Sequence, residues 1–201
     1  MNQTSNIFAA IEPHPFWVWV DPTDMVTHHN MNIVNSFFST PPNTSTETLM
    51  FIPKPNFQGF ISHFQNNLMR NYTADYNLEL ARRAHFPNYP CRLQAFFVLE
   101  SKEDAMTYKN KNSKHVEGRT LARGTTNGAY CFSRHDSAWV NFLRLPHMLS
   151  QEDIHNCTNA YWSGHAAQDC QLMSCGKPWT QNRTTEILFL GRLDFERQPN
   201  A

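Results

Sequence analysis

Glu186 is the acid whose place in the chain is best suited to chemistry. It follows a polar loop, residues 180–185, and directly precedes an apolar segment, residues 187–190. If that segment is a strand, the carboxylate is held at the rim of a sheet, although an ordinary surface acid fits the same place. Arg92 begins a second apolar segment, so its fork of donors can bind a phosphate, a carboxylate or a neighbouring acid.

The segment 133–139 brings His135, Asp136 and Trp139 close together in sequence. A His beside an Asp suggests an acid–base pair, but neighbours in a strand point to opposite faces and such pairs are usually built across a fold. Cys131, four residues before His135, is the best-placed candidate for a nucleophilic thiol, with a buried thiol as the alternative. No HExxH or CxxC spacing occurs, so no metal site is predicted.

The composition gives no overall charge that would select a partner. The 201 residues include 17 basic and 17 acidic side chains, so no global field directs the chain to nucleic acid or to an anionic membrane. Aromatic residues make up 13 % of the chain, which predicts a ring-rich core with some rings left for a pocket. Five cysteines without a CxxC pair favour reduced thiols.

The sequence predicts a cytoplasmic protein without a membrane segment. No apolar run reaches the length of about 18 residues that a membrane span requires, and residues 1–10 lack the pattern of a signal peptide. The length favours a single domain over residues 1–201, with flexible ends at 1–14 and 198–201.

Strands and helices are both expected, which predicts an α+β fold. Apolar residues at steps of four predict one or two helices between residues 61 and 84. Ser101 and Ser150 each begin a Ser-x-x-Asp sequence, which predicts a helix start at both places. Aromatic and β-branched residues predict strands at 15–20, 37–40, 91–99 and 186–195.

Several short motifs follow one another along the chain. The first combines E-x-x-R with F-P-x-x-P-C-R, the second is Y-W-S-G, and the third is an acid before an apolar strand. With these motifs in order between Phe16 and Arg197, the chain resembles a bacterial and phage family related to the ADP-ribosyltransferases. The residues that carry the resemblance are Glu79, Arg82, Phe86, Pro87, Pro90, Arg92, residues 96–99 and 101–105, Asp136, Trp139, Tyr161, Trp162, Ser163, Gly164, Glu186, Ile187 and Leu188.

The resemblance implies an ADP-ribosyltransferase-like split β-sheet core with flanking helices, and NAD as substrate. It implies that Glu186 is the catalytic carboxylate, which stabilises the positive charge on the ribose as the glycosidic bond of NAD breaks. An unknown macromolecule of a host cell, protein or nucleic acid, would be the acceptor, as for a phage effector in host takeover or counter-defence. The implied NAD-contacting residues are Arg92, Ser39, Thr40, His135, Trp139, Tyr161 and Trp162.

The chain departs from the pattern of that family at two places. The first core strand, residues 17–20, has no Arg or His, so Arg92 or His28 would have to take that role. Thr184 stands where a second acid is usual, which disfavours arginine-directed modification of proteins. Nucleic-acid modification, NAD hydrolysis and an inactive scaffold remain open.

Two rival functions come from other classes. The first is a non-enzymatic binding protein that uses an aromatic cleft to sequester a host protein or a nucleotide signal. It would need no fixed acid at position 186. The second is a small nuclease or deaminase that uses His135 or Cys131.

Overall fold

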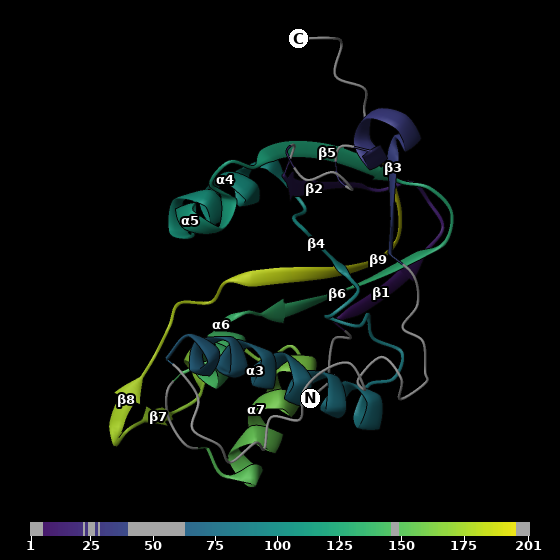
Figure 1. Ribbon diagram of the computed structural model, residues 1–201. Coiled ribbons are helices and arrows are strands. Elements are labelled where there is room, and N and C mark those ends of the chain that lie inside the picture. Colours follow the sequence, from purple (N-terminus) through teal and green to yellow (C-terminus); the bar gives the residue numbers. More distant parts are fainter. Residues whose placement is uncertain are drawn as a thin grey trace. The chain divides into compact units, whose positions relative to one another are not determined.

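The computed structural model describes residues 6–21, 23, 27, 29–39, 63–145 and 149–195. It combines helices with a mainly antiparallel sheet, which confirms the α+β class (Figure 1). The chain divides into two compact units. The sheet unit takes residues 1–40, 94–134 and 186–201, and the helical unit takes residues 41–93 and 135–185. The single domain expected over 1–201 stays a prediction.

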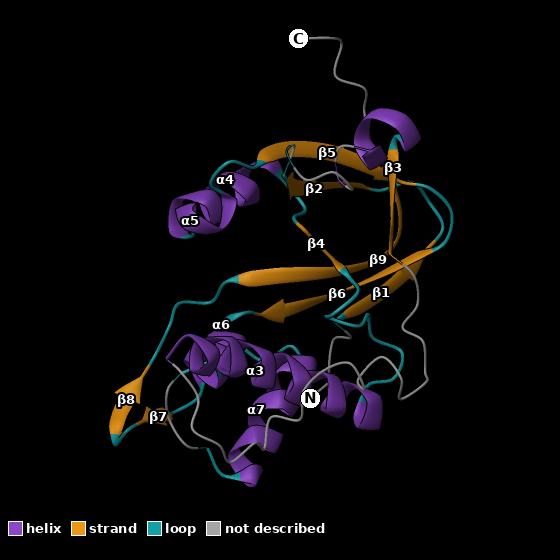
Figure 2. Ribbon diagram, in the orientation of Figure 1, coloured by secondary structure: helices purple, strands orange, loops and turns teal. Residues whose placement is uncertain are grey.

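Seven strands form the sheet of the described chain, along the path β1-β6-β9-β5-β2, with β3 and β4 also paired to β9. Figure 2 draws them in orange. The strands predicted at 15–20 and 186–195 are confirmed. The short strand predicted at 37–40 is confirmed as far as Ser39, and Thr40 lies outside the described residues. The last two residues of β6 and the first of β9 belong to the helical unit. The strands are β1 (Ile7–Ala10), β2 (Pro15–Val20), β3 (Ser36–Ser39), β4 (Phe96–Val98), β5 (Thr120–Thr126), β6 (Tyr130–Asp136) and β9 (Thr185–Phe195).

Gly191 divides β9 into two halves that pair with different strands. Before Gly191, β9 pairs with β4, with Ile187 opposite Val98. From Gly191 onward it pairs with β3 and β5, with Leu193 opposite Phe37 of β3. The sheet therefore has two sections that share one long strand.

We expect Gly191→Ala to destabilise the sheet unit by about 1–3 kcal/mol, the usual cost of overfilling a packed interior. Gly191 has a φ of 148°, and an added Cβ would lie 2.7 Å from the Cβ of Tyr130. Urea unfolding measures the loss. Gly118→Ala is the matched control, because Gly118 also has a positive φ, 74°, but nothing within 4 Å of an added Cβ. Equal losses in the two variants would contradict the argument from crowding.

The core of the sheet unit is rich in aromatic rings, as the composition predicts. The rings of Phe132 and Phe189 lie 5.2 Å and 5.3 Å from that of Phe16, measured between centroids. Ile187 and Phe189 both belong to this core, so their side chains share one face of β9. Because successive side chains of a strand alternate between faces, Glu186 lies on the opposite face.

Two short helices follow β4 in the sheet unit, α4 (Lys102–Lys111) and α5 (Ser113–Val116). The Ser101 side chain accepts a hydrogen bond from the backbone N–H of Asp104, which confirms the predicted helix start. α4 packs against β2, where the ammonium of Lys109 lies 5.6 Å from the centre of the Trp19 ring. A π-helical turn, η1 (Asn30–Val34), precedes β3.

Three helices that contact one another build the helical unit: α3 (His63–His85), α6 (Ala138–Leu143) and α7 (Gln151–Trp162). Ser150 and Asp153 form the predicted capping box at the start of α7. The indole N–H of Trp162 donates to the carbonyl of Leu78, which ties the end of α7 to α3. A 3-10 turn, η2 (Ala167–Asp169), and a hairpin of β7 (Leu172–Ser174) and β8 (Lys177–Trp179) complete the described part of this unit.

The strand predicted over 91–99 is wrong in its first half. Residues 92–94 form a turn, and β4 begins only at Phe96. The physical reason is that Cys91 and Arg92 bind two acids of α3, Glu79 and Asp75. These contacts hold the backbone against the helix instead of in the sheet.

The sequence also predicts flexible chain ends and the absence of a membrane span. The described part of the expected flexible end, residues 6–14, contains β1, and residues 198–201 lie outside the described residues. Within the ranges that the structure describes, no helix has the length and apolar character needed to cross a membrane.

Candidate functional site

Glu186 lies near the start of β9, in the sheet unit. Its side chain is half-buried and lies on the face of β9 opposite the aromatic core. Both β4 and β6 pair with β9, so the backbone that carries Glu186 belongs to a central strand. The backbone that carries the Glu186 carboxylate is therefore held by strand pairing on both sides, near one end of the sheet.

An ion pair lies on the core face at the same end of the sheet. Arg134, in β6, donates through Nε and Nη2 to the carboxylate of Glu100, which follows β4. The guanidinium carbon of Arg134 also lies 4.4 Å and 4.9 Å from the ring centres of Phe8 and Phe132. This arginine is held by the core rings and by Glu100, on the other face from Glu186.

Asp75, in α3, binds two arginines of the helical unit. The Nε of Arg92 donates to Oδ1 at 2.6 Å, and Nη2 of Arg144 donates to Oδ2 at 3.0 Å. The Tyr161 hydroxyl accepts a further hydrogen bond from Arg92 at 3.3 Å. One carboxylate thus binds two guanidinium groups, and these three side chains form the Asp75 cluster. The sequence analysis did not identify Arg144, because a single Arg after a short helix gives no signal.

Four of the predicted NAD contacts lie in the interior of the helical unit. The His135 ring stacks on Tyr161 with 4.4 Å between centroids, and the Trp162 ring meets His135 edge-on at 4.9 Å. The indole N–H of Trp139 donates to the carbonyl of His165. These four predicted residues are at most 2 % exposed, so they pack the interior of the unit. Their contact with NAD stays a prediction.

His135 and Asp136 serve different parts of the helical unit. Nδ1 of His135 lies 2.9 Å from the carbonyl oxygen of Tyr161, and because a carbonyl only accepts, Nδ1 carries the proton. Both carboxylate oxygens of Asp136 bind backbone amides. The acid–base function suggested for this pair stays a prediction. The amides that Asp136 accepts from are those of Ala138, Ala167 and Thr184.

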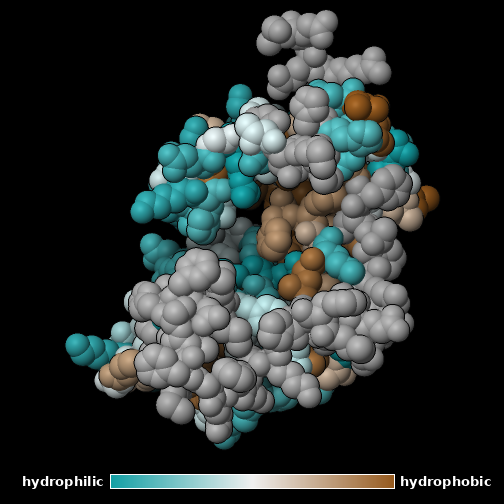
Figure 3. Space-filling view, viewed as in Figure 1, coloured by the Kyte–Doolittle hydropathy of each residue, from teal (hydrophilic) through white to brown (hydrophobic). Residues whose placement is uncertain are grey.

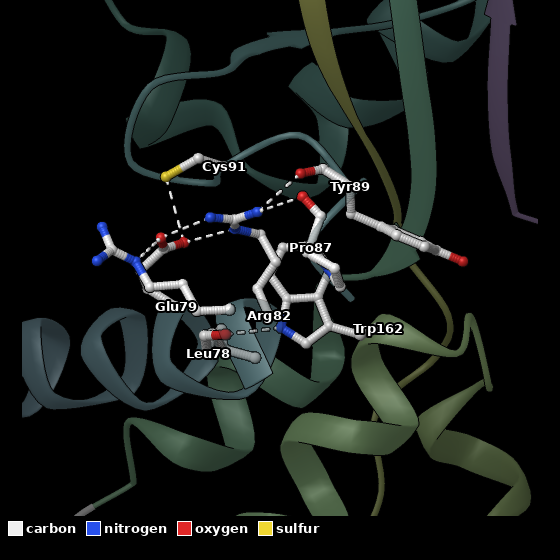
Figure 4. A network of polar contacts seen from close by, with 8 residues as sticks. Leu78, Glu79, Arg82, Pro87, Tyr89, Cys91 and Trp162 are labelled. Atoms are coloured by element: carbon white, nitrogen blue, oxygen red, sulfur yellow. Dashed lines mark hydrogen bonds and ion pairs between the residues drawn. The ribbon is translucent and has the colours of Figure 1, made fainter. Parts of the chain in front are cut away.

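Figure 4 shows a buried network that the E-x-x-R and F-P-x-x-P-C-R motifs form together. Glu79 of α3 is fully buried and accepts hydrogen bonds from Arg82 and from the Cys91 thiol. Arg82 also donates to the carbonyls of Pro87 and Tyr89. These motif residues therefore hold the loop that follows α3 against the helix.

Burial and neighbouring charges determine the protonation states of Glu79 and Cys91 in this network. Burial alone would raise the pKa of Glu79, but hydrogen bonds from Arg82 and Arg83 outweigh burial and hold this pKa below its ordinary value. Burial and the negative charge of Glu79 raise the pKa of the Cys91 thiol to about 11. At neutral pH, Glu79 is therefore charged and Cys91 is a protonated donor.

The surroundings of Cys131 do not favour a nucleophilic thiol. Burial raises the pKa of Cys131, whereas a nucleophilic cysteine needs a lowered one. All five cysteines are free thiols in the structure. Among the residues that the structure describes, no three His, Cys, Asp or Glu side chains gather as a metal site would require.

A cavity of about 380 Å³ opens in the sheet unit. Figure 3 shows apolar side chains, in brown, gathered in a hollow where Figure 1 places β4. Asp21 and Arg119 are charged residues of its lining. The composition predicted rings for a pocket, but no sequence pattern pointed to Phe37, Phe96 and Phe195, because these rings come from separate strands. The apolar lining residues are Val18, Val20, Phe37, Phe96, Leu193 and Phe195.

The predicted site residues fall into two groups. Glu186 belongs to the sheet unit, as does Ser39, which lies opposite Gly191 in the pairing of β3 with β9. In the helical unit, Tyr161 joins Arg92 to His135. Two residues named from the sequence, Thr40 and His28, lie outside the described residues. The predicted site residues of the helical unit are Arg92, His135, Trp139, Tyr161 and Trp162.

The comparison with protein families gave a match over most of the chain. The model of a protein family described as "Protein of unknown function (DUF2441)" matches residues 8–176. No curated protein matches the chain. The matched range includes the Asp75 cluster and the Glu79 network, and it ends before Glu186.

Proposed function

We propose, from the premise that the chain belongs to the DUF2441 family, that this protein binds NAD and transfers ADP-ribose to a macromolecule of a host cell. Glu186 is the catalytic carboxylate of this reaction. The observation that carries the proposal is the placement of Glu186, a half-buried acid near the start of the central strand of an antiparallel sheet. The acceptor is a protein or a nucleic acid.

The split of the sheet supports the ADP-ribosyltransferase-like core that the sequence resemblance implies. β9 carries Glu186 in its first half and passes into the second section of the sheet at Gly191. Ser39, one of the residues implied to contact NAD, lies opposite Gly191 at this transition. One strand thus connects the proposed catalytic acid to the second section of the sheet.

In the transfer of ADP-ribose from NAD, the carboxylate needs a fixed position and a negative charge. The bond between the ribose C1′ and the nicotinamide nitrogen breaks, and nicotinamide leaves with the electron pair. The acceptor nucleophile then bonds to C1′ and releases its proton. Positive charge develops on the ribose between these events, so a carboxylate held by a rigid strand stabilises the transition state more than it stabilises NAD.

The Asp75 cluster supports a binding role for Arg92 towards the phosphates of NAD. Arg92 and Arg144 share the carboxylate of Asp75, at 2.6 Å and 3.0 Å. An anion that binds Arg92 would leave Arg144 as the partner of Asp75. Arginine is well suited to this exchange, because its planar fork binds carboxylate and phosphate alike.

Glu186→Gln tests the proposal. We expect nicotinamide release from NAD to fall about 100-fold, as when one preorganised charge-stabilising group is removed. NAD affinity should change little, because the substitution keeps the size of the side chain. The measurements are calorimetric titration with NAD and nicotinamide release in the same samples.

Glu117→Gln is the matched control, because it removes an exposed acid of the sheet unit and should leave release unchanged. Equal nicotinamide release by wild type and by Glu186→Gln would rule out the catalytic role of Glu186. NAD binding without release in the wild type would favour the non-enzymatic alternative. No binding at millimolar NAD would remove NAD from the proposal altogether.

A further inference from the structure

We infer that the cavity of the sheet unit is a second ligand site, separate from the proposed NAD chemistry, and that it binds a nucleoside monophosphate. The cavity has a volume of about 380 Å³. Ligand pockets span roughly 300–1,000 Å³. This one is near the lower end, which suits a mononucleotide better than a dinucleotide such as NAD.

The cavity lies beside a short bridge between two segments of the sheet unit. β2 meets the segment after β4 at a single bridge, between Trp17 and Leu99. Beyond this bridge the pairing stops, and residues of β2, β3, β4 and β9 surround the cavity. The apolar wall of the site is therefore built on strands, which hold side chains more precisely than loops do, and Arg119 directly precedes β5.

The walls offer contacts for a planar ring. The ring of Phe37 stands nearly perpendicular to Phe96 and to Phe195, at 79° and 82°, with centroids 5.6 Å and 5.0 Å away. All three rings line the cavity, together with aliphatic side chains such as Leu193. An apolar, ring-lined wall of this kind binds a nucleobase by stacking and edge-to-face contact.

The charges beside the cavity favour an anionic group on the ligand. Arg119 lines the cavity, is exposed, and makes no ion pair with any residue of the described ranges. Lys109 is a second nearby cation, since its ammonium lies 5.6 Å from the ring centre of Trp19, another lining residue. The acid of the lining, Asp21, accepts hydrogen bonds from Thr23. We therefore assign the phosphate to Arg119 and the base to the phenylalanine rings.

The cavity and the proposed catalytic acid lie on opposite faces of β9. Leu193 and Phe195 line the cavity and belong to the same core as Ile187 and Phe189. Glu186 points away from that core by the alternation of the strand. A ligand in the cavity therefore does not contact Glu186, and the two sites can be tested separately.

The probe is AMP, titrated by calorimetry into the full chain, with adenosine and inorganic phosphate in parallel. We expect saturable binding of AMP that is tighter than that of either part alone. Arg119→Gln should weaken AMP binding about tenfold, the effect of losing one charge-assisted contact, and should leave adenosine binding unchanged. Lys114→Gln is the matched control, since Lys114 is an exposed cation of the same unit that does not line the cavity.

Three results would overturn the inference. The first is the absence of saturable AMP binding at millimolar concentration. The second is AMP binding that Arg119→Gln and Lys114→Gln weaken equally, which would indicate general charge attraction. The third is AMP binding that Glu186→Gln abolishes, which would place the nucleotide on the other face of β9. A protein that releases no nicotinamide but shows the expected AMP pattern would refute the proposed function and support this site.

Discussion

Glu79→Gln should lower the free energy of unfolding of the helical unit by about 3–5 kcal/mol, the usual cost of removing one partner from a buried ion pair. Arg82 is 3 % exposed, and both of its bonds to Glu79 measure 2.8 Å. The variant keeps the shape of the side chain but leaves the Arg82 guanidinium buried without its counter-charge. Urea unfolding of the full chain measures the loss.

Two comparisons make this result specific. Glu103→Gln removes an exposed acid and should change stability by less than about 0.5 kcal/mol. The double variant Glu79→Gln with Arg82→Met should lose less than the sum of the two single variants, because Glu79→Gln leaves Arg82 without this counter-charge, while Arg82→Met leaves Glu79 with Arg83 as its partner. Additive losses would show that the two side chains contribute independently.

The same substitution should have a smaller effect in acid. The pKa of Glu79 in the folded chain lies below its ordinary value of 4.5, so the charged carboxylate is the form that the fold stabilises. This contribution is complete above the unfolded-state pKa and is lost as the pH falls through the folded-state pKa. The difference in unfolding free energy between wild type and Glu79→Gln should therefore shrink below about pH 4. A constant difference across that range would contradict a charge-based role.

Asp136→Ala should cost about 3 kcal/mol or more, because it leaves three backbone N–H groups without this acceptor, two of them in buried hydrogen bonds and one in a part-buried one, each at about 1–3 kcal/mol. Asp136 is 0 % exposed and receives these bonds at 2.9–3.1 Å. The donors belong to the start of α6, to η2 and to the loop before β9, so one carboxylate holds three segments together. Urea unfolding again measures the effect.

Two further variants show how much of this stability comes from the hydrogen bonds of Asp136. Asp136→Asn should cost less than Asp136→Ala, because its carbonyl oxygen can still accept from Ala138 and Thr184, whereas its amide group faces the donor of Ala167. Asp169→Ala removes an exposed acid of the same unit and should be close to neutral. If all three variants unfold alike, the amide bonds of Asp136 contribute nothing to stability.

Local signals in the sequence predicted a large part of the fold. The Ser101 and Ser150 sequences mark helix starts because a cap needs only residues within one turn. The strand at 15–20 followed from β-branched and aromatic residues in one run. The strand over 91–99 was predicted too long because Cys91 and Arg92 bind acids of α3, between 12 and 17 residues away, which no local pattern reveals.

Less of the candidate site than of the fold could be predicted from the sequence. Glu186 was named from a local signal, an acid before an apolar segment, and its role as a site residue stays a prediction. The face on which Glu186 lies follows from the core membership of Ile187, which only the structure shows. The rings of Phe37, Phe96 and Phe195 carried no shared signal, because they stand on three strands far apart in the chain.

By itself, the sequence determined the α+β class, the caps of α4 and α7, and an acid at the start of the last strand, because these depend on residues within a few positions of one another. Tertiary structure decided what the polar residues bind. Asp136 meets the amide of Thr184 across 48 positions, and Arg92 meets Tyr161 across 69. Contacts over such distances depend on how strands and helices pack, and the same packing brings residues of β2, β3, β4 and β9 together around the cavity.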